Sequence, residues 1–263
     1  MGRPPADGKQ GRDGPAAPSI DKQPARIAGM FDAIAGRYDL LNHLLSGGLD
    51  WYWRRRAVGA LELRGDETVL DLCTGTADLA IAVLRRWRGC RVVGVDFAAR
   101  MLAIGRRKLQ ERGLAGRATL VQGDATRIPL AGNACGAAAV AFGIRNVADP
   151  AAACRELARI LRPGSRLAIL EFSMPRGRVI APAYAWYFRH VLPRIGRLVS
   201  RHREAYAYLP RSVGAFATPA ELATLVEAAG FRVLRAVPLT FGVVYLYVAV
   251  KADAIRRPPA ILA

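Results

Sequence analysis

The residues of this chain that could do chemistry gather after apolar segments that alternate with helix-like ones. The first apolar segment, residues 68–73, leads into the turn GTAD at 75–78, and the second ends on Asp96, about 20 residues past the turn. In a parallel α/β sheet this arrangement places a ligand on the turn and offers its ribose hydroxyls a carboxylate. The turn lacks G-x-G-x-x-G, because Gly75 is its only glycine. We therefore expect a nucleoside without a pyrophosphate.

Individual residues of this turn have expected roles. Gly75 lets the backbone approach a ligand closely, and the hydroxyl of Thr76 can donate a hydrogen bond. Asp71, Gly75 and Ala77 form the pattern acid-x-x-x-Gly-x-small, which resembles motif I of the class I S-adenosylmethionine-dependent methyltransferases. Asp96 is the expected bidentate acceptor for the ribose hydroxyls. The alternatives are that Asp96 caps the next helix, or that the whole segment binds no ligand.

The third apolar segment, residues 118–122, is followed by a second candidate for nucleoside recognition. Asp124 would accept a hydrogen bond from an adenine amino group, and Ala125 would pack on the ring. Because ligands of open α/β sheets bind outside the carboxyl ends of the strands, both are expected beside Asp96. A solvated turn is the alternative for Asp124.

The fourth apolar segment, residues 136–142, is followed by a planar cation, Arg145, and an amide, Asn146. Directly after a buried strand, both would face the ligand. For Arg145 the alternative is a salt bridge to Asp149 or Asp39.

The alternation of strands and helices predicts the fold. We expect strands at 68–73, 91–96, 118–122, 136–142, 165–172, 231–238 and 242–251, and helices at 78–87, 99–112, 150–161 and 218–229. In the last helix Thr218 is the expected N-cap, with Pro219 at the first position and Gly230 after the end. Alternating βα units give a parallel sheet with helices on both faces. A terminal hairpin added to it gives an α/β, Rossmann-like class I methyltransferase fold: a mostly parallel seven-stranded sheet with an antiparallel last strand.

Composition divides the chain of 263 residues into one domain and two tails. Residues 1–24 are rich in Gly, Pro and charge and are expected to be disordered, residues 25–252 form the methyltransferase domain, and 253–263 form a C-terminal tail. Within the domain, residues 25–62 are predicted to be a helical lid, and 176–215 form a basic aromatic insertion. No apolar run reaches the roughly 18 residues of a spanning helix, and the start lacks a secretory signal, so we expect a cytoplasmic protein.

A net charge of +18 requires an explanation. Nucleic acid, an anionic membrane surface, and arginine used simply as a solubilising residue are the three candidates. The densest basic stretch, residues 176–203, interleaves Arg with aromatic and aliphatic residues, which suits an element lying on a membrane, although Pro182 and Pro193 prevent one uninterrupted helix. No nucleic-acid motif is present, so no nucleic-acid partner is expected.

Metal and disulfide chemistry are not indicated. Four cysteines are scattered without a C-x-x-C pair or a histidine at ligand spacing. Buried reduced thiols are expected instead. Each of the three histidines, His43, His190 and His202, is a weak candidate for a general base.

Several longer motifs resemble the ubiquinone/menaquinone biosynthesis C-methyltransferases. They are FDAIAGRYDLLN at 31–42, LSGG at 45–48, Trp53-Arg54, FGIRNV at 142–147, EFS at 171–173, LPRIG at 192–196, and YAYL at 206–209 with Ser212. The resemblance covers roughly residues 26–251. It implies S-adenosylmethionine as co-substrate, no metal, and methyl transfer to a ring carbon of a polyprenylated hydroquinone, in menaquinone biosynthesis (demethylmenaquinol to menaquinol) and/or ubiquinone biosynthesis.

The resemblance also assigns contacts to single residues. Carried over by position, the cofactor contacts fall on Thr76, Asp96, Asp124 and Ala125, with a further one at Ala141, where typical members have Ser. We hypothesise that Arg145 and Asn146 hold or polarise the ring oxygen and stabilise the phenolate as it forms. Tyr38 would hydrogen-bond the same oxygen or align the ring; packing on Phe31 is its alternative.

The sequence leaves some points open. Where the family carries A-L-H, this chain has Tyr245-Leu246-Tyr247, and the loop 128–136 lacks the family's acids and Phe residues. A soluble phenolic substrate is therefore an alternative to a quinol. For the quinol, we expect peripheral association with the inner face of the membrane. A homodimer formed through the insertion is possible.

Overall fold

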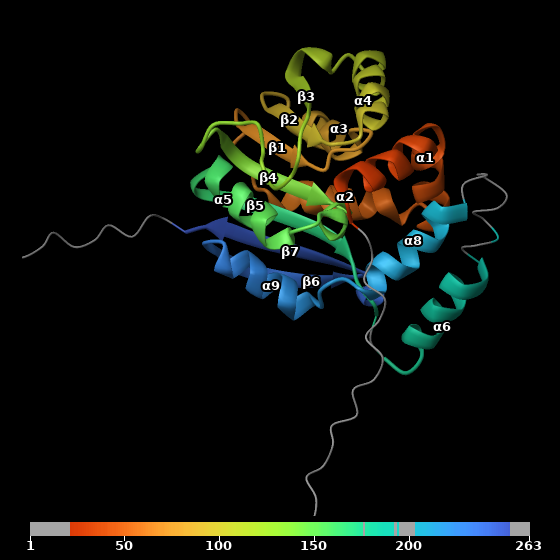
Figure 1. The fold of residues 1–263 in the computed structure, drawn as a ribbon. Coiled ribbons are helices and arrows are strands. Elements are labelled where there is room, and N and C mark those ends of the chain that lie inside the picture. Colours follow the sequence, from red (N-terminus) through yellow and green to blue (C-terminus); the bar gives the residue numbers. More distant parts are fainter. Residues whose placement is uncertain (1–21, 176, 192–193, 195–202, 253–263) are drawn as a thin grey trace, which may run out of the picture.

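A seven-stranded sheet with the order β3-β2-β1-β4-β5-β7-β6 forms the centre of the protein (Figure 1). This computed structural model describes residues 22–175, 177–191, 194 and 203–252. The strands are β1 (Thr68–Leu72), β2 (Arg91–Asp96), β3 (Ala118–Gln122), β4 (Cys135–Ala141), β5 (Leu161–Phe172), β6 (Phe231–Leu239) and β7 (Val244–Lys251). Strands β3, β2, β1, β4 and β5 pair in parallel, and β7 is antiparallel to both β5 and β6. The predicted sheet is confirmed.

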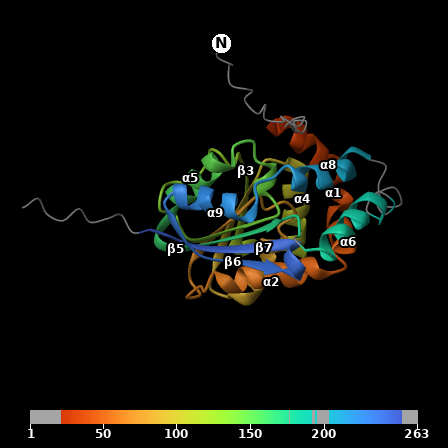
Figure 2. The same cartoon turned by 90° about the horizontal axis from the view of Figure 1, so that it is seen from below.

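Helices cover both faces of this sheet (Figure 2). They are α1 (Pro24–Leu45), α2 (Leu49–Ala60), α3 (Asp78–Arg86), α4 (Ala99–Glu111), α5 (Pro150–Ile160), α6 (Ile180–Trp186), α8 (Arg203–Gly214) and α9 (Pro219–Ala228). Helices α2, α3 and α4 bury their apolar sides in one core, and α5 and α9 bury theirs in the other. In α9, Thr218 and Glu221 form a capping box and Pro219 occupies the first turn, as predicted.

Strand β5 is longer than the sequence predicts. The Arg162-Pro163-Gly164 sequence ends α5 but also lies inside β5, which begins at Leu161. Leu161 pairs with Cys135, and regular pairing resumes only at Arg166, so the intervening residues form an irregularity in the ladder. Such an extra segment accommodates the proline and glycine without ending the strand.

Helices α1 and α2 occupy the predicted lid region. Helix α1 packs against α4, where Ala35 meets Ala98 and Met101. Near its end, Leu41 meets Tyr187 and Leu209. The lid therefore joins the start of the chain to the βα layer and to the insertion.

The insertion is helical but interrupted. It contains α6, a π-helical turn η3 (Tyr187–Val191) and α8. Pro182 lies in the first turn of α6, where a proline is tolerated. Pro193, most of the LPRIG motif and His202 lie outside the described residues, as do both predicted tails apart from residues 22–24.

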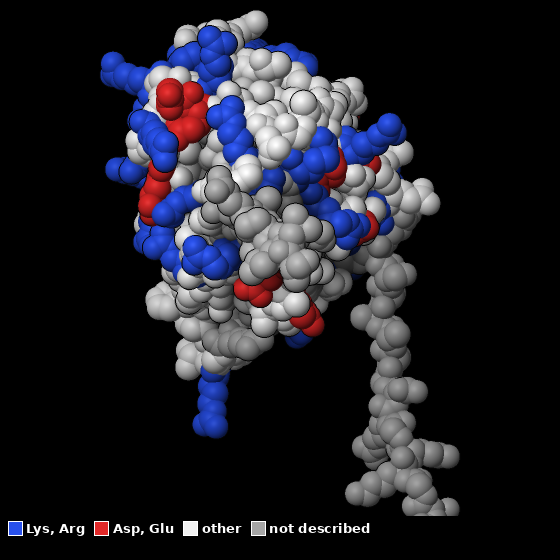
Figure 3. All heavy atoms as spheres, turned by 90° about the vertical axis from the view of Figure 1, so that its left-hand side faces the viewer, with Lys and Arg blue, Asp and Glu red and all other residues white. Residues whose placement is uncertain are grey.

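Arginine and lysine are not confined to the insertion. Figure 3 shows the side of the molecule that lies on the left in Figure 1, and Lys and Arg are spread over it with Asp and Glu among them. The excess of 39 basic over 21 acidic residues therefore does not by itself mark one binding face.

Gly143 permits two loops to touch at the carboxyl edge of the sheet. A Cβ at this position would lie 2.2 Å from the Cβ of Cys73, much closer than carbon atoms can approach. Cys73 itself has φ +59°, which is unusual for a residue with a side chain. The loops after β1 and β4 can therefore pack together only because Gly143 has no side chain.

We expect Gly143→Ala to lower the free energy of unfolding by about 1–3 kcal/mol through overpacking, as measured by urea unfolding. Adding Cys73→Gly should restore most of the loss, because it removes the opposing Cβ and glycine suits the positive φ. Gly116→Ala is the control, since nothing lies within 4 Å of its added Cβ. Equal stability of the two alanine variants would contradict the packing argument.

Candidate active site

The loops after β1 and β2 are tied together through the carboxylate of Asp96. The N–H of Gly75 donates to Asp96 Oδ2 at 2.8 Å, and the N–H of Ala98 donates to Oδ1 at 2.9 Å. Gly75 has φ +54°, a conformation that glycine adopts without strain. Burial raises the pKa of Asp96 although these amide hydrogen bonds oppose the rise. Helix α4 has Ala98 as its N-cap, so the helix-cap alternative for Asp96 is wrong.

Asp71 lies beneath the turn rather than on its surface. Its side chain is buried, and Oδ2 accepts hydrogen bonds from the hydroxyl of Thr74 at 2.6 Å and from the N–H of Ala80 at 3.0 Å. These bonds fix the turn and the first turn of α3. Any effect of Asp71 on a ligand would therefore pass through the turn that it shapes.

Thr76 joins the turn to the lid. Its hydroxyl donates to Asp39 Oδ1 at 2.5 Å and accepts from Lys108 Nζ at 3.2 Å. Lys108 also contacts Asp39 Oδ2, at 2.7 Å, and Asp78 Oδ1. A threonine has one hydroxyl hydrogen, and in this structure it is directed at Asp39 of α1. The expected donation from Thr76 to a ligand stays a prediction.

A cavity of about 400 Å³ lies at the carboxyl ends of β2, β3 and β4. Its lining includes Phe97, Asp124, Ala125 and Asn146. Asp124 is exposed, and its Oδ1 accepts hydrogen bonds from the N–H and hydroxyl of Thr126. The other carboxylate oxygen leaves Asp124 able to accept from a ligand. The residues predicted for adenine recognition thus lie together beside the strand that ends on Asp96.

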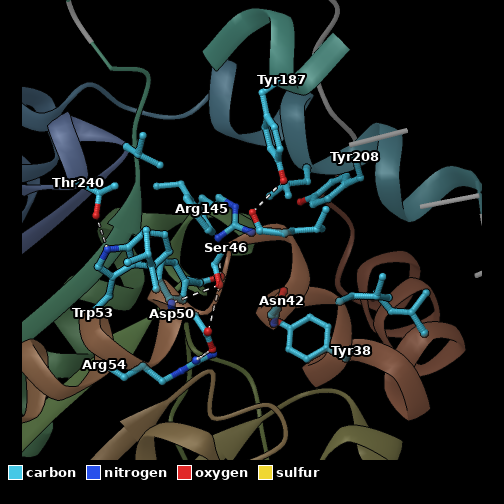
Figure 4. A pocket seen from close by; sticks show the side chains of 18 of the residues that line it. Tyr38, Asn42, Ser46, Asp50, Trp53, Arg54, Arg145, Tyr187, Tyr208 and Thr240 are labelled. Atoms are coloured by element: carbon cyan, nitrogen blue, oxygen red, sulfur yellow. Dashed lines mark hydrogen bonds and ion pairs between the residues drawn. The ribbon is translucent and has the colours of Figure 1, made fainter. Parts of the chain in front are cut away.

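A second cavity, of about 260 Å³, lies between the lid, the loop after β4 and the insertion. Figure 4 shows Tyr38, Arg145, Tyr187 and Tyr208 pointing toward its centre from four different segments. Most of the remaining lining is apolar or aromatic: Met30, Phe31, Ile34, Leu41, Leu45, Leu49, Trp53, Phe142, Phe172, Tyr184, Leu209 and Val243. An apolar cavity with a few polar groups is typical of a small-molecule site.

Arg145 is the buried cation of this cavity, and its partner is Glu171. Its Nη1 lies 2.7 Å from Glu171 Oε1 and also donates to the Phe142 carbonyl at 2.6 Å. Burial disfavours the charge on Arg145, but the charge and hydrogen bond of Glu171, together with the phenols of Tyr38 and Tyr208, outweigh this and raise the pKa of Arg145. Both alternatives from the sequence are wrong, because Asp39 binds Lys108 and Asp149 caps α5.

One buried donor of Arg145 has no hydrogen-bond partner in the part of the protein that the structure describes. Among the described residues, its Nε is one of two buried side-chain donors or acceptors without a hydrogen-bond partner, the other being the indole nitrogen of Trp87. An unpaired buried donor is costly unless something binds it. In a cavity of this kind the fitting partner is an oxygen that carries or develops negative charge.

Tyr38 lies on the same cavity, from α1. Burial raises its pKa, although a hydrogen bond with Asn42 and the charge of Arg145 oppose the rise. The phenol therefore stays protonated and can donate a hydrogen bond. Its ring also packs edge-on against Phe31, with centroids 5.9 Å apart, so the packing expected as the alternative is present as well.

Asn146 connects the two cavities. Its side chain borders the 400 Å³ cavity, while its Oδ1 accepts a hydrogen bond from the hydroxyl of Tyr208, which lines the other. Its Nδ2 donates to the Phe142 carbonyl at 3.4 Å. The structure thus separates two residues that the sequence placed on one ring oxygen: Arg145 borders the apolar cavity and Asn146 the cavity beside Asp124. Ala141, the further predicted contact, is half-buried at the end of β4.

Sequence reasoning assigned no role to Lys108, Glu171 or Tyr208. Lys108 follows Met101 and Gly105 at helical spacing on the buried side of α4, and a charge at such a position was a usable signal. Glu171 and Tyr208 lay within the quoted motifs, but nothing local to them revealed that they contact Arg145 and Asn146.

The structure also locates His43, the four cysteines and Tyr247, to which the sequence drew attention. His43 is largely exposed, but its Nδ1 lies 3.0 Å from Asp50, which also binds Arg54. All four cysteines are free thiols, three of them buried. Tyr247, which replaces a family histidine, packs in the core and does not line the apolar cavity. Within the described parts of the chain, no three His, Cys, Asp or Glu side chains are grouped so that they could hold a metal ion.

The sequence is similar to known methyltransferases over most of its length. The model of the ubiE/COQ5 methyltransferase family matches residues 19–251. The chain is 47% identical over 218 residues to the ubiquinone/menaquinone biosynthesis C-methyltransferase UbiE of Syntrophotalea carbinolica, covering 83% of this chain and 91% of that protein. It is 48% identical over 219 residues to the demethylmenaquinone methyltransferase of Thermus thermophilus, covering 83% and 98%.

Solved structures share the fold. A SAM-dependent methyltransferase from Aquifex aeolicus has a TM-score of 0.58 at 19% identity, covering 88% of this chain and 99% of that one. The cyclase SpnF has a TM-score of 0.65, also at 19% identity, covering 86% and 96%. At such identities the likeness concerns the fold alone.

Asp71 provides a test of how the turn is held. Burial raises its pKa from the usual 3.8 to about 7, so the native state keeps a proton that the unfolded chain releases. Stability contributed by this group is therefore lost as pH rises from about 4 to about 7. At about 1.4 kcal/mol for each tenfold change in acidity, the loss amounts to at most about 4 kcal/mol.

Asp71→Asn should remove this part of the pH dependence, because an amide oxygen can accept the same two hydrogen bonds without ionising. We expect the variant to gain stability relative to the wild type between pH 5 and pH 8, measured by urea unfolding. Asp66→Asn, at an exposed position, controls for the loss of a carboxylate. Parallel pH curves for wild type and Asp71→Asn would show that the buried group does not titrate in this range.

Proposed function

The chain belongs to the ubiE/COQ5 methyltransferase family, and on this premise we propose that it methylates a ring carbon of a polyprenylated hydroquinone. It is an S-adenosylmethionine-dependent methyltransferase, as its family and fold indicate. The proposed reaction is the conversion of demethylmenaquinol to menaquinol in menaquinone biosynthesis and/or the corresponding C-methylation in ubiquinone biosynthesis. Relatives that carry the name demethylmenaquinone methyltransferase support the menaquinone branch.

One observation carries the proposal for the acceptor: the buried guanidinium of Arg145 in an apolar, aromatic cavity beside the strand ends. A hydroquinone ring matches such a cavity, because its faces are apolar and its edge carries a hydroxyl. The unpaired Nε of Arg145 matches that hydroxyl oxygen. A cation beside a phenol lowers the phenol's pKa by favouring the charged form.

The proposed mechanism requires little more than positioning and charge stabilisation. S-adenosylmethionine supplies an activated sulfonium methyl, so no metal is required. Arg145 stabilises the ring oxygen as it loses its proton, which makes the neighbouring ring carbon nucleophilic. Tyr38, held protonated, donates a hydrogen bond to the ring oxygen or aligns the ring. Methyl transfer leaves the cofactor as the neutral thioether S-adenosylhomocysteine. The proton on the methylated carbon then moves by way of water to the ring oxygen, and the ring regains its aromatic character. The phenolic proton lost at the start is the one proton released to solvent.

The cofactor would occupy the 400 Å³ cavity and the turn beside it. Asp96 would accept hydrogen bonds from the ribose hydroxyls, and Asp124 would accept one from the adenine amino group. Ala125 would pack against the adenine ring. Gly75 offers backbone close to the ligand, and Thr76 and Asp71 hold that backbone in place. Asn146 borders this cavity, and its hydrogen bond with Tyr208 connects it to the acceptor cavity. This position suits a residue at the place where the methyl group passes from the cofactor to the acceptor.

We also propose that the protein works on the inner face of the cytoplasmic membrane, where a quinol with a polyprenyl tail resides. No helix of the described chain is long and apolar enough to cross a membrane. Binding from one side, through basic and aromatic residues, is the mode that the composition supports. A homodimer remains an alternative use of the insertion.

The direct experiment is methyl transfer from labelled S-adenosylmethionine into quinols, with demethylated menaquinol compared against a methoxy-polyprenyl-benzoquinol. We expect label in the ring of at least one of the two, and the preferred one identifies the head group. Cofactor binding without any labelled quinol, but with methylation of a soluble phenol, would replace the proposed acceptor.

Arg145→Ala should lower kcat at least 100-fold, because it removes the charge that stabilises the phenolate. The Kd for S-adenosylmethionine, measured by calorimetry, should stay within about threefold, since Arg145 borders the other cavity. Arg145→Ala also leaves the buried Glu171 unpaired, which can destabilise the protein. Arg145→Lys is therefore a second variant that keeps a positive charge. We expect Arg145→Lys to fold normally and to have intermediate turnover. Arg232→Ala, at an exposed position, is the control. Wild-type turnover in Arg145→Ala would exclude the proposed role.

A further inference from the structure

Exposed apolar side chains are concentrated on the segments that enclose the acceptor cavity. Among the described residues, ten large apolar side chains are exposed, and all but Leu234 belong to α1, α2, the segment 174–186 or the turn η4 (Thr240–Gly242). The most exposed are Phe241 at 77%, Val179 at 74%, Trp51 at 64% and Trp186 at 60%. Exposed apolar side chains gathered on a few neighbouring segments are typical of an interaction site.

Specific contacts join these segments around the cavity. The indole N–H of Trp53 in α2 donates to the hydroxyl of Thr240 at 2.8 Å, which places the β6–β7 turn beside α2 (Figure 4). The hydroxyl of Tyr187 donates to the Leu45 carbonyl at 2.9 Å, which places the insertion beside the end of α1. Gly242 lies next to Pro175, where its added Cβ would be 3.9 Å from the proline Cα. We name the exposed apolar residues of these segments the cavity rim: Leu44, Leu49, Met174, Val179, Trp186 and Phe241.

The charges of the chain around the rim residues are mainly positive, although α1 also carries Asp32 and Asp39 before residue 40. Residues 40–60, 173–194 and 236–244 contain a single acid, Asp50, and it is paired with Arg54. Exposed arginines in these segments are Arg55, Arg56, Arg178, Arg189 and Arg194. By contrast, acids are interspersed with basic residues on the side shown in Figure 3. Apolar and aromatic residues bordered mainly by basic ones are complementary to an anionic lipid surface.

The size of the cavity bears on the substrate's tail. At about 260 Å³ it is near the small end of ligand sites, so it suits a ring and not a long polyprenyl chain. Exposing such a chain to water costs about 0.8 kcal/mol for each CH₂ group. A tail that is neither enclosed by protein nor exposed to water must remain in lipid.

We propose that the cavity rim docks on an anionic lipid bilayer and that the quinol ring enters the cavity directly from the bilayer while its tail stays in the lipid. This inference rests on the proposed function. The rim then serves two purposes, because it holds the protein on the membrane and surrounds the entrance to the cavity.

Phe241 is the leading anchor of this surface. It occupies the tip of the β6–β7 turn with φ +57°, next to Thr240 at φ +47°. A bulky residue at positive φ is uncommon and costs conformational energy, and here its ring points to solvent. Trp186 is suited to the same boundary, since an indole combines an apolar body with one polar group.

The test uses the full chain with vesicles of phosphatidylglycerol and phosphatidylcholine, and compares two variants. Phe241→Asp with Trp186→Asp alters the rim, and Leu234→Asp is the matched control, because Leu234 is an exposed apolar residue of β6 that belongs to none of the segments around the cavity. Neither Phe241 nor Trp186 lines the cavity. We expect the rim variant to lose at least tenfold in vesicle co-sedimentation and in methylation of a polyprenylated quinol in vesicles. Its turnover of a tail-free quinol in solution should stay within twofold of the wild type.

The outcomes separate this inference from the function on which it rests. If the wild type methylates neither quinol, the proposed function fails. If it methylates both and the rim variant keeps vesicle binding and turnover, the docking surface is wrong. Replacing Arg55 and Arg56 by Glu should weaken binding to the anionic vesicles and not to phosphatidylcholine alone. If the rim variant instead turns a dimer into a monomer with unchanged vesicle binding, the rim is an interface between subunits and the inference is overturned.

Discussion

The ion pair between Arg145 and Glu171 is the interaction on which the site depends. Glu171, at the end of β5, receives the Arg145 guanidinium, the Arg145 N–H at 3.2 Å and the Phe172 N–H at 2.9 Å. Two buried charges are tolerated only when each is paired and hydrogen-bonded, and this pair meets that condition without using Nε of Arg145. The pair therefore fixes the loop after β4 against β5 and keeps a positive charge on the wall of an apolar cavity.

A second, partly exposed cluster couples the lid to the cofactor turn. Lys108 of α4 binds Asp39 of α1 and Asp78 of α3, and the hydroxyl of Thr76 lies between them. Because Asp39 is one residue from Tyr38, the position of the turn and the position of a residue on the acceptor cavity are mechanically connected. The two cavities are also connected on the other side, through Asn146 and Tyr208. The structure thus connects the two cavities of the proposed methyl-transfer site through side chains from several parts of the domain.

The fold was largely predictable because it follows from local patterns. Short apolar runs that alternate with amphipathic helices specify a parallel sheet, and Thr218 with Pro219 specifies the start of α9. The start of β5 was missed since Arg162-Pro163-Gly164 predicts a break, whereas Leu161 pairs with Cys135 before the irregularity. Whether such a sequence ends a strand or forms an irregularity within it depends on the neighbouring strand, which no local pattern specifies.

The sequence by itself determined which residue types follow each strand, and therefore that Asp96, Asp124, Arg145 and Asn146 meet at one edge of the sheet. Tertiary structure alone decided their partners. Arg145 pairs with Glu171 and not with Asp39 or Asp149, and Asn146 accepts a hydrogen bond from Tyr208. It also decided that exposed apolar residues far apart in the chain surround one cavity. The reason is physical. Strand order and helix packing bring together residues separated by tens to hundreds of positions, and a single sequence carries no direct record of those separations.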